Sequence, residues 1–221
     1  MKPDLIIFDL DGTLVDTVRD IADALNAACA PHGLRPFTLD ETRDMVGQGM
    51  ATLISRALGP GRAALAEPTL REFVRIYSAG LSVHSRPYPG VPETLAGLAG
   101  SFRMAVLSNK SQALSRELLE ALGLARWFEL IEGGDSVPEK KPSPRAVTHV
   151  LDALGVAAHD AVVVGDSAFD VDAAQGAGVR AVGVTYGFRP RASIAHADVL
   201  VDRFADLPRV LSPSTRMGYH L

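Results

Sequence analysis

The chain has 221 residues, enough for one domain of ordinary size plus a substantial insertion, and 47% of them are hydrophobic, which excludes a mainly disordered protein. Its net charge of −4 argues against a nucleic-acid-binding surface, because such surfaces are rich in clustered lysine and arginine. The longest early apolar run, residues 5–8, is too short for a signal peptide or a membrane span, so we expect a cytoplasmic protein without a membrane partner. The single cysteine, Cys29, cannot form an internal disulfide and is expected to be a buried structural thiol.

The first predicted element is a strand over residues 5–9. Its sequence, LIIFD, is continuously apolar up to the aspartate, as is typical of a strand buried on both faces. The glycine of the following DLDGT ends the strand. Asp9 and Asp11 are therefore expected at a strand's carboxyl end, where a spacing of two lets both carboxylates face one small site.

A helical insertion is predicted next. From Val18 to Cys29 apolar residues recur at helical spacing, and further helical stretches are expected around Thr42, Ala51 and Phe73. The segment HSRPYPGVPETL, rich in proline and glycine, is typical of a chain re-entering another module. We expect an all-helical cap domain of residues 15–84 inserted into a core formed by residues 1–14 and 85–221.

After the insertion, strands and helices alternate. Strands are expected at residues 104–107, 130–132, 161–164, 179–184 and 199–201. The clearest helix begins after Ser143, a natural N-cap, has Pro144 at its first position and stops at Gly155. This alternation predicts an α/β fold with a doubly wound, mostly parallel sheet, whose sites form beyond the carboxyl ends of the strands. The last ten residues, from Ser212 on, are expected to be loosely held.

Several polar residues follow the predicted strands: Asp9, Asp11, Ser108, Asn109, Lys141, Asp166 and Asp170. A lone Asp-x-Asp pair is also common in turns. Because these strand ends converge in a doubly wound sheet, however, several carboxylates would meet one ammonium group, which is unfavourable without a cation. Oxygen-only ligands favour Mg²⁺, and the scattered histidines lack the spacing of a zinc site.

The motifs DLDGT, LSN, KKPSP and GDSAFD resemble the four ordered motifs of the haloacid dehalogenase superfamily. The helical insertion after the first motif resembles the cap of the subgroup that contains phosphoglycolate phosphatases and beta-phosphoglucomutases. Longer runs are most similar to phosphoglycolate phosphatases, namely YPGVPETL, LSNK, GGDSVPEKKPSP, GDSAFDVDAAQGAG and GVTYGF. The resemblance covers essentially the whole chain.

The resemblance implies a phosphatase that works through an aspartyl phosphate. Asp9 would be the nucleophile, and Asp11 would protonate the leaving alcohol and then activate water. A carboxylate can attack at neutral pH without a base. Ser108 and backbone N–H groups near it would hold the phosphoryl oxygens, while Lys141 would offset the charge on the nucleophile and the phosphate.

The resemblance also implies the metal ligands. Asp166 would bind Mg²⁺ together with Asp9 and the backbone carbonyl of Asp11. Asn109 and Asp170 would have supporting roles. For Asp170, the alternative to positioning the metal or the lysine is a first-turn acid stabilised by the helix dipole.

The cap offers a different set of residues. No lysine occurs between Lys2 and Lys110, which makes a phosphonatase or a typical beta-phosphoglucomutase unlikely because each needs a cap lysine. The segment ETRDMVGQGM resembles the specificity loop of the cap, so Arg43, Gly47 and Gln48 are expected nearest the substrate. The alternative is an ordinary boundary between two helices.

The expected partner is a small phosphorylated metabolite, with phosphoglycolate preferred. Related caps also serve sugar phosphates, nucleotides and pyrophosphate. Two non-enzyme alternatives are a receiver-like domain, which is shorter and lacks an inserted cap, and a silent phosphate-binding relative. The expected assembly is a monomer or a homodimer.

Overall fold

The sheet at the centre of the molecule is the one predicted from the sequence. The computed structural model describes residues 3–211, so the expectation for residues 212–221 lies outside the described part. Six parallel strands have the spatial order β5-β4-β1-β6-β7-β8. They are β1 (Leu5–Phe8), β4 (Arg103–Leu107), β5 (Leu130–Glu132), β6 (Ala161–Gly165), β7 (Arg180–Val184) and β8 (Val199–Val201). The α/β, doubly wound prediction is confirmed, because the chain builds outward on both sides of β1.

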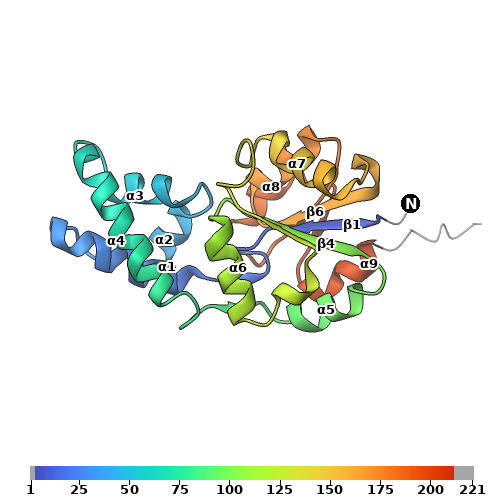
Figure 1. Cartoon of the computed structure of the whole chain (residues 1–221), viewed down its shortest axis with the longest axis horizontal. Coiled ribbons are helices and arrows are strands. Elements are labelled where there is room, and N and C mark those ends of the chain that lie inside the picture. The colour runs from blue at the N-terminus through green and yellow to red at the C-terminus, as the bar shows by residue number, and fades with distance from the viewer. Residues whose placement is uncertain (1–2, 212–221) are drawn as a thin grey trace, which may run out of the picture.

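Helices cover both faces of the sheet (Figure 1). Ile6 and Phe8 belong to the core shared with α5 (Val91–Leu98), α6 (Gln112–Ala121) and α9 (Leu207–Leu211). Leu5 and Ile7 point to the opposite face and pack in the core of α7 (Pro144–Leu154) and α8 (Ala168–Gly176). Successive strand side chains alternate between faces, so a central strand must be apolar throughout. Burial on two faces is the physical reason for the continuous LIIF run.

The predicted signals at both ends of α7 are present in the structure. The Ser143 hydroxyl accepts a hydrogen bond from the backbone N–H of Arg145 at 3.3 Å, and Pro144 occupies the first helical position. Gly155 ends the helix in the left-handed conformation at φ 64°, which glycine adopts without strain. This helix start fixes the preceding segment, which carries Lys141, at the carboxyl edge of the sheet.

Four helices form a separate cluster beyond that edge, on the left in Figure 1. They are α1 (Val18–Cys29), α2 (Leu39–Met45), α3 (Met50–Leu58) and α4 (Ala66–Ala79), and we call them the helical unit. The helical stretches expected around Thr42, Ala51 and Phe73 are therefore α2, α3 and α4. A two-stranded antiparallel ribbon, β2 (Val15–Asp16) with β3 (Arg86–Pro87), forms the two connections to the sheet. Within residues 3–211, no helix combines the length and apolarity needed to span a membrane.

Candidate active site

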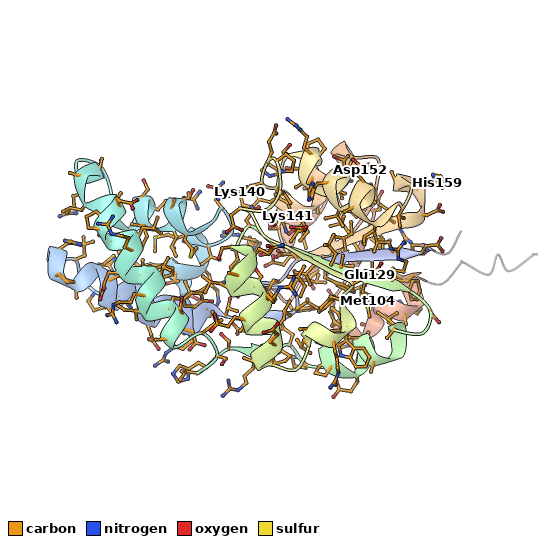
Figure 2. All side chains as sticks on the ribbon, viewed as in Figure 1. Met104, Glu129, Lys140, Lys141, Asp152 and His159 are labelled. Atoms are coloured by element: carbon orange, nitrogen blue, oxygen red, sulfur yellow. The ribbon has the colours of Figure 1, made fainter. Side chains whose placement is uncertain are left out.

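A pocket of about 60 Å³ lies between the carboxyl edge of the sheet and the helical unit. The sheet side supplies four carboxylates and three cationic groups, whereas the helical unit supplies mainly apolar walls. The charged lining residues are Asp9, Asp11, Asp166, Asp170, Lys110, Lys141 and Arg189, and the walls include Leu53, Phe73 and Tyr77. Figure 2 shows Lys140 and Lys141 at the end of the sheet that faces the helical unit, whereas His159 lies at the far end.

Asp9 directly follows the carboxyl end of β1 and contacts Lys141. Its backbone N–H donates to the carbonyl of Val164 at 2.9 Å and so extends the strand pairing by one residue. Lys141 Nζ donates to Asp9 Oδ1 at 2.8 Å, to Asp170 Oδ1 at 2.6 Å and to the Leu107 carbonyl at 2.6 Å. Burial alone would lower the pKa of Lys141, but Asp170 and Asp9 raise it above its usual value. The buried ammonium is charged and uses all three of its N–H groups.

The carboxylates of Asp9, Asp166 and Asp170 each place one oxygen within 4.8 Å of the others. Burial is the largest cause that raises the pKa of Asp9 to about 7 and that of Asp166 well above its usual range. One ammonium cannot neutralise three buried carboxylates, so this group fits a bound metal ion. Gly12 makes room for the Asp166 carboxylate, because a Cβ at this position, where φ is 88°, would lie 2.3 Å from Asp166 Oδ2.

The carboxylate of Asp11 lies outside this group of three. Its Oδ1 accepts a hydrogen bond of 2.6 Å from the Thr17 hydroxyl, and its Oδ2 lies 3.0 Å from Lys110 Nζ. The two aspartates of the DLDGT motif thus face different partners, although both line the pocket. Asp11 is therefore oriented by a hydroxyl and an ammonium.

Ser108 and Asn109 follow β4 and lie beside this edge. Ser108 is buried, and its backbone N–H donates to the Glu132 carbonyl at 3.0 Å. Asn109 Nδ2 donates to the carbonyls of Lys141 at 2.9 Å and of Gly47 at 2.8 Å, and its Oδ1 accepts from the Lys141 N–H at 3.0 Å. Asn109 therefore fixes the loop that carries Lys141 and ties that loop to the helical unit.

The residues expected on the helical unit are only partly brought to the pocket. Gly47 lines it, but Arg43 and Gln48 do not. Arg43 pairs at 2.6 Å with Asp40, which lies three residues before it on α2. Gln48 accepts a hydrogen bond from Arg56 at 2.5 Å. Arg43 and Gln48, which the sequence pattern was expected to bring nearest the substrate, therefore do not line this pocket in the structure.

Two cationic residues of the pocket were not singled out by the sequence patterns. Lys110 is buried, and its Nζ donates to the Tyr77 hydroxyl at 2.9 Å and lies 4.8 Å from the centre of that ring. Burial would lower its pKa, but Asp11 and Tyr77 raise it above its usual value, so Lys110 is charged. Arg189 reaches across to the helical unit and donates to the carbonyls of Asp44, at 3.3 Å, and Val46. The signal for Lys110 was its place directly after LSN; for Arg189 the sequence held none.

Comparisons with known proteins agree with this site. A model described as haloacid dehalogenase-like hydrolase matches residues 6–184. A phosphoglycolate phosphatase of Agrobacterium fabrum is 39% identical over 213 residues, 94% of this chain and 91% of the relative. One from Neisseria meningitidis serogroup A is 43% identical over 192 residues, 83% of this chain and 80% of the relative. The crystal structure of a predicted phosphoglycolate phosphatase from Haemophilus somnus superposes with a TM-score of 0.90 at 32% identity, covering 96% of this chain and 99% of that one.

The family model spans the first strand, the helical unit and the later motifs, and the similar proteins align over most of their length. Motif residues that are far apart in sequence also meet at one pocket, among them Asp9, Lys141 and Asp166. This chain belongs to the haloacid dehalogenase-like hydrolase family.

Proposed function

We propose that this hydrolase is a magnesium-dependent phosphatase that converts 2-phosphoglycolate and water to glycolate and phosphate. The observation that carries the chemistry is the contact of 2.8 Å between Asp9 and Lys141 in a pocket that also holds Asp11 and Asp166. The substrate is supported by the relatives named phosphoglycolate phosphatase.

In this proposal Asp9 attacks the phosphorus atom and becomes an aspartyl phosphate. Lys141 offsets negative charge on the nucleophile and on the phosphoryl group, and its fixed partners keep it in place during the attack. The Ser108 hydroxyl and nearby backbone N–H groups bind the phosphoryl oxygens. Splitting the transfer into two steps lets water replace the alcohol.

Asp11 handles the proton in both steps. When protonated it donates to the bridging oxygen of the leaving alcohol, and as a carboxylate it takes a proton from the water that attacks the aspartyl phosphate. The Thr17 hydroxyl fixes the orientation of Asp11. Asp11 suits this role because it lies near the nucleophile but is not one of the three clustered carboxylates of Asp9, Asp166 and Asp170.

Asp9, Asp166 and the backbone carbonyl of Asp11 would hold Mg²⁺, which supplies positive charge at the phosphoryl oxygens when bound. Asp170 positions Lys141, because its Oδ1 accepts from Lys141 Nζ at 2.6 Å. Its Oδ2 accepts from the Ser167 hydroxyl at 2.6 Å, which fixes the orientation of the Asp170 carboxylate. Residues 15–84 would act as a cap on a core of residues 1–14 and 85–221, which excludes water from the reacting groups.

A phosphatase of another small substrate is the second candidate. Small sugar phosphates and pyrophosphate differ from phosphoglycolate in the group beyond the phosphoryl, so direct kinetics separates them. A receiver-like or silent binding protein would release no phosphate from any of these compounds.

The test is phosphate release from a panel containing 2-phosphoglycolate, a hexose phosphate, a nucleotide, pyrophosphate and an aryl phosphate, with Mg²⁺ present. We expect the highest kcat/KM with 2-phosphoglycolate. Asp9→Asn should lose turnover of every substrate while keeping its fold, whereas the exposed Asp4→Asn should behave as the parent. More than trace turnover by Asp9→Asn would refute the mechanism, and a preference for hexose phosphate would refute the substrate.

A further inference from the structure

We infer that Lys110 binds the carboxylate of the leaving group and thereby makes the enzyme selective for short phosphate esters that carry a carboxylate next to the ester carbon. This role rests on the proposed function. It concerns a residue outside the nucleophile, the acid and the carboxylates that fit a metal ion. The inference is drawn from the position, partners and surroundings of the Lys110 ammonium.

The first argument compares the three cationic side chains that line the pocket. Lys141 has all three N–H groups committed to Asp9, Asp170 and the Leu107 carbonyl. Arg189 directs both terminal nitrogens at carbonyls of the helical unit. Among residues 3–211, the Lys110 ammonium has two polar partners, Asp11 and Tyr77, and a lysine has three N–H groups. Of the two lysines, Lys110 is therefore the one with an N–H group to spare for an anionic ligand, while the Arg189 guanidinium is held against the carbonyls of Asp44 and Val46.

The second argument is geometric. In the proposed mechanism Asp11 donates its proton to the bridging oxygen of the substrate, so that oxygen lies against the Asp11 carboxylate. In phosphoglycolate the carboxylate carbon is separated from the bridging oxygen by a single methylene group. Lys110 Nζ lies 3.0 Å from Asp11 Oδ2. A substrate in contact with Asp11 therefore brings its carboxylate beside Lys110, whereas Arg43 lies outside this pocket.

The third argument concerns the surroundings of the ammonium. The side chain of Lys110 is only 5% exposed, and the pocket walls nearby include Ile21, Phe73 and Tyr77 of the helical unit. The Phe73 and Tyr77 rings stack at 5.5 Å, so the hydroxyl that accepts from Lys110 is held by packing. A charged hydrogen bond in such a dry, ordered setting is stronger than one in water. Losing this hydrogen bond should lower kcat/KM for a carboxylate-bearing substrate much more than for a phosphate ester without a carboxylate.

The experiment compares two substrates that differ only at this group. 2-Phosphoglycolate and 2-hydroxyethyl phosphate share the bridging oxygen and its methylene, but only the first carries a carboxylate. We expect Lys110→Met to lower kcat/KM for both substrates, because Asp11 loses a partner. The ratio of kcat/KM for 2-phosphoglycolate to kcat/KM for 2-hydroxyethyl phosphate should fall by roughly tenfold to a hundredfold. The control is Arg116→Met, which removes one positive charge from an exposed side chain of α6 and should leave the ratio unchanged.

A binding measurement separates recognition from proton transfer and from misfolding. Calorimetry would compare the affinity for 2-phosphoglycolate of Asp9→Asn with that of the double variant Asp9→Asn/Lys110→Met, both checked for native circular dichroism. Lys110→Gln serves as a second variant if methionine disturbs folding. We expect roughly tenfold or greater loss of affinity for 2-phosphoglycolate and little change for 2-hydroxyethyl phosphate.

The outcomes distinguish the inference from the function on which it rests. A parent enzyme that does not prefer 2-phosphoglycolate to 2-hydroxyethyl phosphate would refute the proposed substrate. A parent that has the preference, with a Lys110→Met variant that keeps it, would overturn the role of Lys110 alone. A preference erased by Arg43→Ala and not by Lys110→Met would overturn it as well and would assign the carboxylate to α2.

Discussion

Opposite charges are paired closely around the pocket, but the buried carboxylates of Asp9, Asp166 and Asp170 outnumber the one ammonium, Lys141, that pairs with members of this group. Lys141 offsets part of the charge of Asp9 and Asp170, while Asp166 is stabilised chiefly by the backbone N–H of Phe188, which donates to its Oδ2 at 2.6 Å. Buried carboxylates without a full set of cations favour either protonation or a bound metal ion.

Asp166→Asn should weaken metal binding more than it harms the fold. The asparagine oxygen can still accept from the Phe188 N–H, but the ligand charge is lost. We expect a rise in the Mg²⁺ concentration that gives half-maximal activity, with partial recovery of the rate at high Mg²⁺. A magnesium titration of steady-state rates measures this, with Asp172→Asn, exposed on the following helix α8, as the control. An unchanged half-saturating concentration would remove Asp166 from the ligand set.

The metal-free protein should lose stability as pH rises toward neutrality. Burial raises the pKa of Asp9 from its usual 3.8 to about 7, so the folded state holds this proton more tightly than the unfolded state. The contribution of protonated Asp9 to the free energy of unfolding is complete below about pH 4 and is lost as pH rises through about 7. Mg²⁺ binds the ionised form, so the gain in Tm that it gives should grow over the same range.

Thermal unfolding at several pH values between 4 and 8, with chelator and with Mg²⁺, measures this effect. Asp9→Asn should reduce the pH dependence in chelator, since the amide does not titrate while the buried Asp166, whose pKa burial also raises, still does. A gain in Tm from Mg²⁺ that is the same at every pH would contradict the prediction.

At the scale of elements, the connection between the helical unit and the sheet is stabilised by one buried carboxylate. Asp20 on α1 accepts from the backbone N–H groups of His84, at 2.9 Å, and Ser85, at 2.7 Å, and from the Ser85 hydroxyl at 2.7 Å. These residues directly precede β3, which pairs with β2. The returning chain is thus held against the first helix before it re-enters the sheet.

Asp20→Ala should therefore lower the free energy of unfolding by about 1–3 kcal/mol, because it leaves buried donors without an acceptor. Urea unfolding measures the change. Asp23→Ala is the matched control on the same helix: Asp23 is exposed and pairs at the surface with Arg19 and, at 3.9 Å, with His84, so its loss should cost about 0.5 kcal/mol or less. Equal effects of the two substitutions would mean that Asp20 does not stabilise the connection.

At the scale of the whole molecule, the pocket is closed by contacts from both units. Asn109 and Arg189 on the sheet side donate to carbonyls of residues 44–47, and Lys110 reaches Tyr77 of α4. A substrate must enter a site that these contacts cover. The β2–β3 ribbon is the natural hinge, because it forms both connections.

We expect the helical unit to move relative to the sheet and to close when a phosphate analogue binds. Spin labels at Ser55 on α3 and Thr148 on α7, both exposed, would report the distance between the units after replacement by cysteine, with the buried Cys29 left in place. Addition of Mg²⁺ and orthovanadate should narrow the distance distribution. An identical distribution with and without vanadate would count against this motion.

The sequence by itself determined the elements and the chemistry on their ends. The LIIF run had to be a two-faced central strand because all four residues are apolar, and Ser143, Pro144 and Gly155 specify α7 by local backbone chemistry. The sheet rule then predicted that residues after β1, β4 and β6 would meet, and Asp9, Ser108 and Asp166 do line one pocket.

Only the tertiary structure decided which cations face the pocket. Arg43 fits the resemblance to a specificity loop, yet it pairs with Asp40 on its own helix and does not line the pocket. Lys110 and Arg189 enter because Tyr77 and the carbonyls of residues 44–46 come within hydrogen-bond reach of them across the two units. Strand ends are fixed by pairing along the sheet, whereas the orientation of a helix at a pocket depends on packing between units, which no local pattern encodes.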